Sequence, residues 1–402
     1  MAELLGGTID DVPRGTIDDV PPASSIPHAS IVAALSVQLS AILERATANL
    51  RAAARADRVG KSWTADDELS IPLENLSVAA KAVSDGATKL VLVLSAKPPY
   101  PGAAAVTSIC DEFGDRNEEL VAALAVVEVA GAAGPLWLEA AQVVAGVVAA
   151  AKGLVNTILR QGAGNAEVPR ATGVVWEAVE QSKKVPKSNR VAYRRAFMVK
   201  SGVVRDTIEE FQAMVDASPS PSSASSSSSS SPAGSAATPQ SGDAFDDDFD
   251  FADMDGDDEY DAEDLPLATA CVESLKLLRP TLKTAMDAMD AAVAGTASSG
   301  GGDGKTGLDR NAELWLLCQR VTNAATEFGA SLYPPLDVEE VEAAAGPFKS
   351  TVREIAAHCA IVADMVEGGE AKVSAQAAGF RKVAAIWETQ FAQLDEALST
   401  TP

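Results

Sequence analysis

The chain has 402 residues, of which 22% are charged, and its formal net charge is −25. So acidic a chain argues against nucleic-acid binding, because phosphate contacts need a basic protein surface. Aromatic residues make up only 5%, which favours Ala-rich helix packing over a β-sheet. The length itself predicts two to three domains.

The four cysteines lie far apart in the sequence and form no CxxC pair. They are Cys110, Cys271, Cys318 and Cys359. This spacing indicates neither a zinc site nor a disulfide framework. We expect free, buried thiols in a reducing compartment inside the cell, with no metal and no cofactor.

The first 28 residues contain a direct repeat with a period of eight residues. The two copies, each reading Gly-Thr-Ile-Asp-Asp-Val-Pro, cover residues 7–13 and 15–21. Pro and Gly punctuate each copy, so we predict a disordered tail over residues 1–28. The same stretch lacks a basic run followed by an apolar run, and no signal peptide is expected.

Residues 29–217 show apolar side chains at intervals of three and four, the spacing of helices that bury one face. The pattern predicts helices over about 30–58, 66–95, 103–130, 136–160, 173–182 and 188–217. We interpret this part as an N-terminal bundle of about five long helices. Its most apolar region, residues 120–158, is interrupted by polar side chains, so we predict no membrane span.

Residues 218–264 carry the composition of a disordered linker. Seven consecutive serines run from Ser225 to Ser231, and residues 243–264 hold thirteen acidic residues and no basic one. Such a segment buries too little apolar area to offset its backbone entropy. Phe245, Phe249 and Phe251 lie among the acids, so the segment is either a solubilising spacer or a docking segment.

Residues 265–402 repeat the helical spacing. The pattern predicts helices over about 265–293, 308–332, 347–368 and 371–399, with a kink at Pro280. Four helices with short connections favour an antiparallel four-helix bundle. The predicted fold class is therefore all-α, with two helical bundles separated by the Ser-rich and acidic linker.

No motif predicts catalysis or metal binding. Gly302–Gly307 satisfies the GxGxxG pattern, but a Ser- and Gly-rich loop precedes it where a phosphate site needs a strand. Asp253 to Gly256 imitates part of a calcium loop, yet the first and last ligand positions lack oxygen atoms. We predict no catalytic, cofactor-binding or metal-binding residues, and no enzymatic activity.

The two histidines do not suggest a nucleophilic site either, because no orienting third group accompanies them. His28 lies in the N-terminal region, and His358 is predicted on a helix surface. Four residues that precede proline are candidate sites for proline-directed kinases: Ser218, Ser220, Ser231 and Thr238.

Residues 183–205 contain eight Lys and Arg and no acidic residue. A solvated helix face explains this cluster as well as a docking surface for an acidic partner. The partner could be the chain's own acidic tract, which the Ser-rich segment would hold at high effective concentration.

Two short stretches resemble the cyclin-D-binding protein family, also called GCIP or Maid-like proteins. The first is Val175-Trp176-x-Ala178 with Gln181 and then Pro186-Lys187-Ser188-Asn189-Arg190. The second is Ala330-Ser331-Leu332-Tyr333-Pro334-Pro335. An acidic insert between two helical halves is also similar to the family, and the resemblance covers roughly residue 63 to the C-terminus.

The resemblance implies an all-helical, non-enzymatic protein that binds D-type cyclins or adaptor proteins and restrains cell growth. We therefore expect a protein-binding regulator of the cell cycle or transcription, located in the cytoplasm and nucleus, that binds neither nucleic acid nor membrane. One alternative is a structural adaptor whose bundles bind amphipathic helices. The other is a helix-loop-helix dimerisation inhibitor, in which residues 173–217 pair with another chain.

Overall fold

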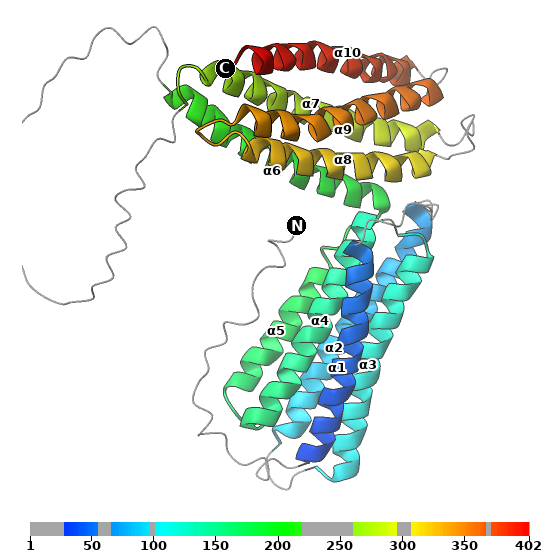
Figure 1. The fold of residues 1–402 in the computed structure, drawn as a ribbon. Helices are drawn as coiled ribbons and strands as arrows, with labels where there is room; N and C mark the ends of the chain where they lie inside the picture. Colours follow the sequence, from blue (N-terminus) through cyan, green and yellow to red (C-terminus); the bar gives the residue numbers. More distant parts are fainter. Residues whose placement is uncertain are drawn as a thin grey trace, which may run out of the picture. The chain divides into compact units, whose positions relative to one another are not determined.

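The computed structural model describes residues 28–54, 66–96, 101–132, 134–218, 260–295, 307–366 and 371–401. Within these ranges the chain forms ten α-helices and no strand (Figure 1). The predicted all-α class is therefore confirmed. The predicted N-terminal tail up to residue 27, most of the predicted linker and the glycine-rich loop before Gly307 lie outside the described residues.

The helices occur in the order that the apolar spacing predicts. Their bounds are α1 Ala29–Ala54, α2 Asp66–Leu94, α3 Ala103–Val129, α4 Gly134–Gln161, α5 Glu167–Ser182, α6 Asn189–Ala217, α7 Leu265–Gly295, α8 Gly307–Ala330, α9 Val338–Val366 and α10 Ala371–Thr400. The chain divides into two compact units, Met1–Tyr193 and Arg194–Pro402. We call them the first and the second unit.

Two helices begin earlier than predicted, and in each a side chain just upstream accepts an amide of the first turn. The Asp337 carboxylate accepts the amides of Glu339 at 2.9 Å and Glu340 at 3.2 Å, which starts α9 nine residues before Pro347. The Asn165 side chain accepts the Glu167 amide at 2.9 Å and starts α5. A capping acceptor satisfies amides that have no partner in the first turn.

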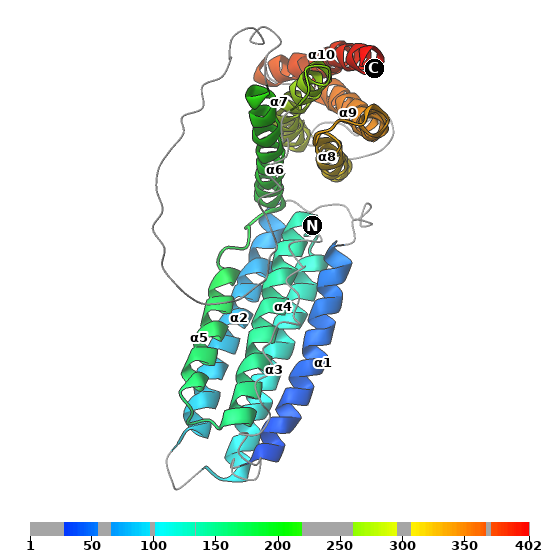
Figure 2. The ribbon, with the colours of Figure 1, turned by 60° about the vertical axis from the view of Figure 1, so that its left-hand side comes forward.

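The first unit is a bundle of α1 to α5 (Figure 2), and its core is mainly aliphatic. Helix α1 packs against α3 and α4, α2 packs against α3 and α5, and α4 packs against α5. Most of the core side chains are Ala, Val and Leu, so the helices interlock through small and branched groups.

Helices α1 and α4 are long and apolar enough to cross a membrane by length and composition alone. Within the bundle, thirteen residues of α4 are buried, from Pro135 to Ile158. Helix α1 likewise directs Val32, Leu39 and Ile42 into the core. A helix buried among other helices passes the same length and composition test as a membrane span.

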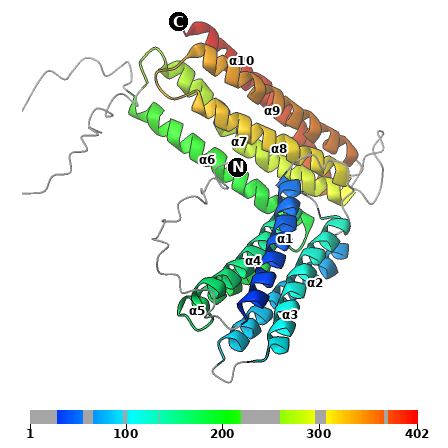
Figure 3. The same cartoon turned by 60° about the horizontal axis from the view of Figure 1, so that its bottom comes forward.

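The second unit packs helices α7 to α10 together (Figure 3), and aromatic rings of α8, α9 and α10 meet in its core. The Phe328 and Phe348 rings stack with centroids 5.2 Å apart, and Trp387 lies 5.7 Å from Phe348 and 5.2 Å from Phe391. The Trp387 indole donates a hydrogen bond of 2.8 Å to the Thr281 hydroxyl. The buried polar group of this large side chain is therefore satisfied.

Helix α6 belongs to the second unit from Arg194 onward, although the apolar pattern assigned residues 29–217 to one bundle. Phe197 packs on Trp315 with centroids 5.4 Å apart, and Phe211 packs on Tyr333 at 5.1 Å. The spacing of apolar side chains along α6 indicates which face is buried but not which bundle buries it. The second unit thus contains α6 in addition to the four helices predicted for residues 265–402.

The two described ends of the predicted linker meet at one place in the second unit. The Tyr260 amide donates to the Ser218 hydroxyl at 2.8 Å, and the Tyr260 phenol donates to the Leu332 carbonyl at 2.7 Å. Tyr260 is only 1% exposed. Ser218 and residues 260–264 are therefore part of the folded unit, and residues 219–259 lie outside the described part of the chain.

Candidate functional site: a groove between α6 and α7

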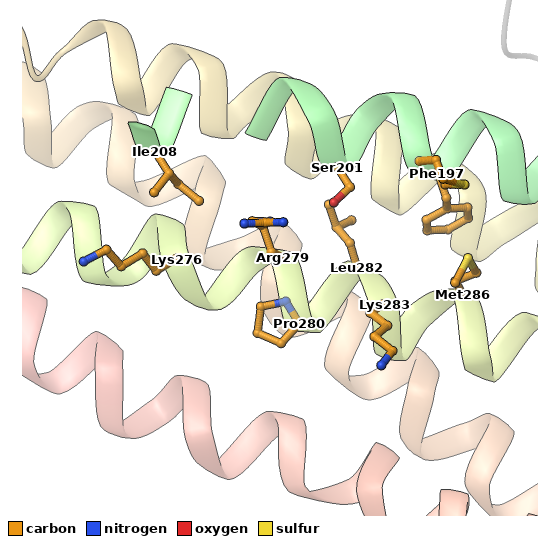
Figure 4. A pocket seen from close by; sticks show the side chains of 10 residues that line it. Phe197, Ser201, Ile208, Lys276, Arg279, Pro280, Leu282, Lys283 and Met286 are labelled. Atoms are coloured by element: carbon orange, nitrogen blue, oxygen red, sulfur yellow. The ribbon is translucent and has the colours of Figure 1, made fainter. Parts of the chain in front are cut away.

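A groove of about 510 Å³ lies between α6 and α7, entirely within the second unit (Figure 4). Helix α6 contributes Phe197, Met198, Ser201 and Ile208, and α7 contributes Lys276, Arg279, Pro280, Leu282, Lys283 and Met286. The groove exists because large side chains hold α6 away from the closely packed helices α7 to α10. A pocket of this size suits a few anchoring side chains of a bound segment.

The floor of the groove is apolar and its α6 edge is open. Phe197 and Leu282 are 2% and 1% exposed, whereas Met198 is 72% exposed. In Figure 4 the Phe197 ring points from α6 toward Met286 of α7. Met is flexible and polarizable, so an exposed Met beside a buried ring adapts to partners of different shape.

Pro280 interrupts the hydrogen-bond ladder of α7 at the same wall. Proline has no amide hydrogen, so the Lys276 carbonyl four residues earlier receives no helical hydrogen bond from this position. Both residues line the groove.

Three cations of α7 border the groove with a helical spacing of three and four residues: Lys276, Arg279 and Lys283. Lys276 pairs with Glu273 at 2.7 Å. Among the described residues, Arg279 and Lys283 have no carboxylate within ion-pair distance, and Arg279 projects into the space between the helices in Figure 4. An apolar floor with a basic rim is complementary to an acidic segment with apolar anchors.

The basic region predicted at residues 183–205 is divided by the boundary of the units and is partly neutralised. Lys183 pairs with Glu180 at 2.5 Å, Arg194 pairs with Asp290, and Arg205 lies 2.8 Å from Asp206. Burial lowers the pKa of Lys200. These pairings leave less charge for an acidic partner than the sequence suggests. The basic spacing on α7 was missed by the sequence reasoning, although it recurs at three and four residues.

The predicted surface position of His358 is wrong. His358 is 6% exposed, and its Nε2 lies 2.9 Å from the Arg310 carbonyl. Ser218 is also inaccessible, because its hydroxyl is buried between the Met214 carbonyl and the Tyr260 amide. The other three candidate kinase sites lie outside the described residues, as does the imitation calcium loop.

The four thiols are free and buried, as the sequence predicts. Burial raises the pKa of Cys110 to about 11 and the pKa values of Cys271 and Cys359 to about 12. The pKa of Cys318 is raised well above its ordinary value for the same reason. Thiols with such pKa values are poor nucleophiles and poor metal ligands at neutral pH. Within the described residues no three His, Cys, Asp or Glu side chains gather as a metal site.

Two other hollows lie in the first unit and lack the same combination. A shallow one of about 640 Å³ follows α3 and is lined mainly by polar and acidic side chains such as Asp111, Asp115 and Glu119. A smaller one of about 330 Å³ lies between α1 and α3 and has no cation in its wall. Neither joins a broad apolar floor to unpaired charge, which leaves the α6–α7 groove as the better protein-binding candidate.

The apolar faces of α5 and α6 are used within their own units. Val168, Val175 and Val179 of α5 belong to the core of the first unit. Phe197, Val204, Ile208 and Phe211 of α6 are buried as well. The buried stripes of residues 173–217 are therefore not free to pair with another chain, which counts against a helix-loop-helix dimer formed through them, although Trp176, Val191 and Val199 are exposed.

The second stretch that resembles the family, residues 330–335, forms hydrogen bonds with α6 and with Tyr260 at the end of the linker. Leu332 accepts the Tyr260 hydrogen bond, and the Tyr333 hydroxyl donates to Glu210 of α6 at 2.5 Å. In the first stretch, the Trp176 indole donates to Thr88 of α2 at 3.2 Å, and Asn189 donates to the Gly131 carbonyl at 3.0 Å. Both stretches thus tie helices together.

Comparison with known proteins agrees with these observations. Residues 75–217 match the model for the N-terminal part of the Grap2 and cyclin-D-interacting family. A Xenopus laevis protein named cyclin-D1-binding protein 1 homolog is 27% identical over 289 residues, 71% of this chain and 78% of that protein. A Danio rerio protein of the same name is 30% identical over 181 residues, 41% of this chain and 49% of that protein. The chain is therefore similar to the Grap2 and cyclin-D-interacting family over residues 75–217, and to two proteins named for cyclin D1 binding.

Proposed function

We propose that this chain is a non-enzymatic, protein-binding regulator of the cell cycle whose α6–α7 groove receives a D-type cyclin or an adaptor protein. The observation that carries the proposal is the similarity to two proteins named for cyclin D1 binding. The alignment with the Xenopus laevis protein extends into both units, because neither unit is long enough to contain it.

The groove supports a defined chemistry for the partner. Phe197, Leu282 and Met286 would receive two or three apolar side chains, while Arg279 and Lys283 would face acidic ones. An amphipathic helix with an acidic flank meets both conditions, since its apolar side chains recur every three or four residues. The partner segment is thus expected to be acidic and to lose affinity as salt rises.

The proposal includes no cofactor, no binding to nucleic acid or membrane, and residence in the cytoplasm and nucleus. The net charge of −25 supports the absence of nucleic-acid binding. Fluorescence imaging of the tagged full chain tests the location. Exclusion from the nucleus would contradict a direct role beside nuclear cell-cycle proteins.

A structural adaptor that binds amphipathic helices is a second candidate, and the same groove favours it. The two candidates differ in selectivity. A regulator should bind a D-type cyclin far better than unrelated acidic amphipathic peptides, whereas an adaptor should bind several such peptides with similar affinity.

Calorimetric titration of the purified full chain with a purified D-type cyclin tests the proposed function. Met198→Glu and Lys283→Glu should each weaken binding about tenfold, which corresponds to about 1.4 kcal/mol. Lys382→Glu is the matched control, because Lys382 is an exposed cation on α10 outside the groove. No binding by the unaltered chain, or equal weakening by all three variants, would refute the proposal.

A further inference from the structure

We propose that residues 243–259 of this chain dock in its own α6–α7 groove and compete there with the external partner. The competition rests on the proposed function, whereas the docking itself does not. The occupant is identified by its composition, by the positions of the two chain ends and by the charges that line the groove.

The composition of residues 243–259 matches both the basic rim and the apolar floor of the groove. The segment holds ten acidic residues and no basic one, with Phe245, Phe249 and Phe251 among them. Arg279 and Lys283 have no ion pair with any described residue, and the floor between them and α6 is apolar. Acidic side chains on the rim and Phe side chains on the floor would satisfy both features.

The two ends of the segment's tether lie close to the groove's own helices. Ser218 closes α6, Tyr260 precedes α7, and the two residues share a hydrogen bond of 2.8 Å. Forty-one residues therefore leave and return at one point of the second unit. A tethered segment reaches millimolar effective concentration when its length spans the distance to the site.

The length of the segment fits that distance. Along α7, the groove residues Arg279 and Met286 lie ~21 Å and ~32 Å from Leu265, at 1.5 Å per residue. Phe249 is eleven residues before Tyr260, so an extended chain places it up to ~36 Å away. Phe249 and Phe251 can therefore reach the groove without any change in the second unit.

The other cations near α6 are worse sites for the same segment. Arg194 already pairs with Asp290, and Arg205 pairs with Asp206. A docking segment would have to displace these carboxylates, whereas Arg279 and Lys283 offer charge without such a competitor. The α7 rim is therefore preferred over the basic region at residues 183–205.

Thiol labelling in the full chain tests the docking without any partner protein. Met198→Cys places a reactive thiol on the groove edge, and Val199→Cys places one on α6 at 61% exposure but outside the groove. The four native thiols are buried and should react slowly. A maleimide probe then reports how well the docked segment covers position 198.

The decisive variant is Phe245→Ser/Phe249→Ser/Phe251→Ser, which preserves every charge. In the Met198→Cys background it should raise the labelling rate at least about threefold at low salt. One molar salt should also raise the labelling rate of position 198 when residues 243–259 are unaltered. The labelling rate of Val199→Cys should be the same with and without the three Phe substitutions. Equal rates at position 198 with and without the three Phe would overturn the proposal.

A second measurement separates this inference from the proposed function. In the Met198→Cys chain without residues 243–259, a synthetic peptide of those residues should slow the labelling of position 198. Arg279→Glu/Lys283→Glu should abolish this protection. If the peptide protects but no cyclin binds, docking stands and the proposed function fails. If a cyclin binds with the same affinity with and without residues 243–259, competition for the groove is refuted.

Discussion

The two units bury their cores with different side chains, and within the described residues only the second unit shows a groove with an apolar floor and a basic rim. The largest fully buried side chains of the first unit include Trp137 and Phe113, set among many Ala, Val and Leu. The second unit buries Trp387, Tyr260, Phe211, Phe328, Phe348 and Phe391. Small side chains let helices approach closely, whereas aromatic side chains act as spacers.

This difference explains why α6 is held away from its neighbours. Its contacts with the second unit run through rings, such as Phe197 on Trp315, rather than through close backbone approach. Gly329 is the exception, because a Cβ at this position would meet the Thr207 methyl at 2.8 Å and the Phe211 ring at 3.1 Å. Helix α6 is thus fixed near Gly329 and leaves a groove beside α7.

The substitutions with the largest expected effect remove one core side chain from each unit and test whether the two units are stable independently. Trp387→Ala should lower the unfolding free energy of the second unit by about 3–5 kcal/mol, because it removes a ring packed against two others. Leu154→Ala in α4 should cost the first unit about 2–5 kcal/mol. Amide hydrogen exchange measures the stability of each unit separately. Loss of protection in α1 to α5 upon Trp387→Ala would show that the units are not independently stable.

Alkaline pH should weaken the second unit more than the first. Burial raises the pKa of Cys271 and Cys359 to about 12, so the folded state keeps protons that the unfolded chain releases near pH 8.5. The stabilisation is complete below that pH and is lost as pH rises toward 12, at about 1.4 kcal/mol per pH unit and thiol.

Denaturation of the full chain at pH 8, 9 and 10, followed by exchange within each unit, measures this slope. The first unit has one buried thiol, Cys110, with a pKa of about 11, whereas the second has three among the described residues. Cys271→Ala/Cys318→Ala/Cys359→Ala should flatten the slope of the second unit. An unchanged slope would assign the effect to other groups, such as Tyr260, whose pKa is also raised by burial.

Two glycines offer a direct comparison of tight and adaptable contacts. Gly329→Ala should destabilise the second unit by about 1–3 kcal/mol, because Thr207 and Phe211 of a packed helix must shift. Gly114→Ala in α3 meets the amide of Gln38, a flexible side chain, and should change stability by less than about 0.5 kcal/mol. Thermal unfolding measures both, and Thr207→Ser should rescue the first variant. If Gly329→Ala left the stability unchanged, α6 would be able to shift away from Gly329 at little cost.

The smallest expected effect on stability comes from the hydrogen bond between Ser218 and Tyr260, which joins the two described ends of the linker. Ser218→Ala removes the acceptor of the Tyr260 amide and should cost about 1 kcal/mol, seen as faster exchange of that amide. Ser95→Ala, which removes an exposed hydrogen bond to the Val91 carbonyl at the end of α2, should cost less than about 0.5 kcal/mol. Equal effects would show that Ser218 and Tyr260 do not hold the two chain ends together.

The sequence alone determined the helices, the absence of strands from the described chain and the resemblance to the cyclin-D-binding family. Apolar side chains at intervals of three and four, interrupted by Pro and Gly, suffice for this because helix formation is local. Errors arose at helix starts, as at α9, which Asp337 caps and which begins nine residues before Pro347, where the sequence reasoning had begun the helix. The surface position assigned to His358 failed because its neighbour Arg310 lies on another helix.

Only the tertiary structure decided which bundle receives α6 and where unpaired charge meets an apolar floor. The apolar stripe of α6 is the same whether α6 packs with the first or the second unit, so local spacing could not choose between them. The groove depends on residues about eighty positions apart, such as Phe197 and Arg279, that become neighbours through aromatic packing. Helices follow from short-range hydrogen bonds, but a binding surface follows from which helices bury one another.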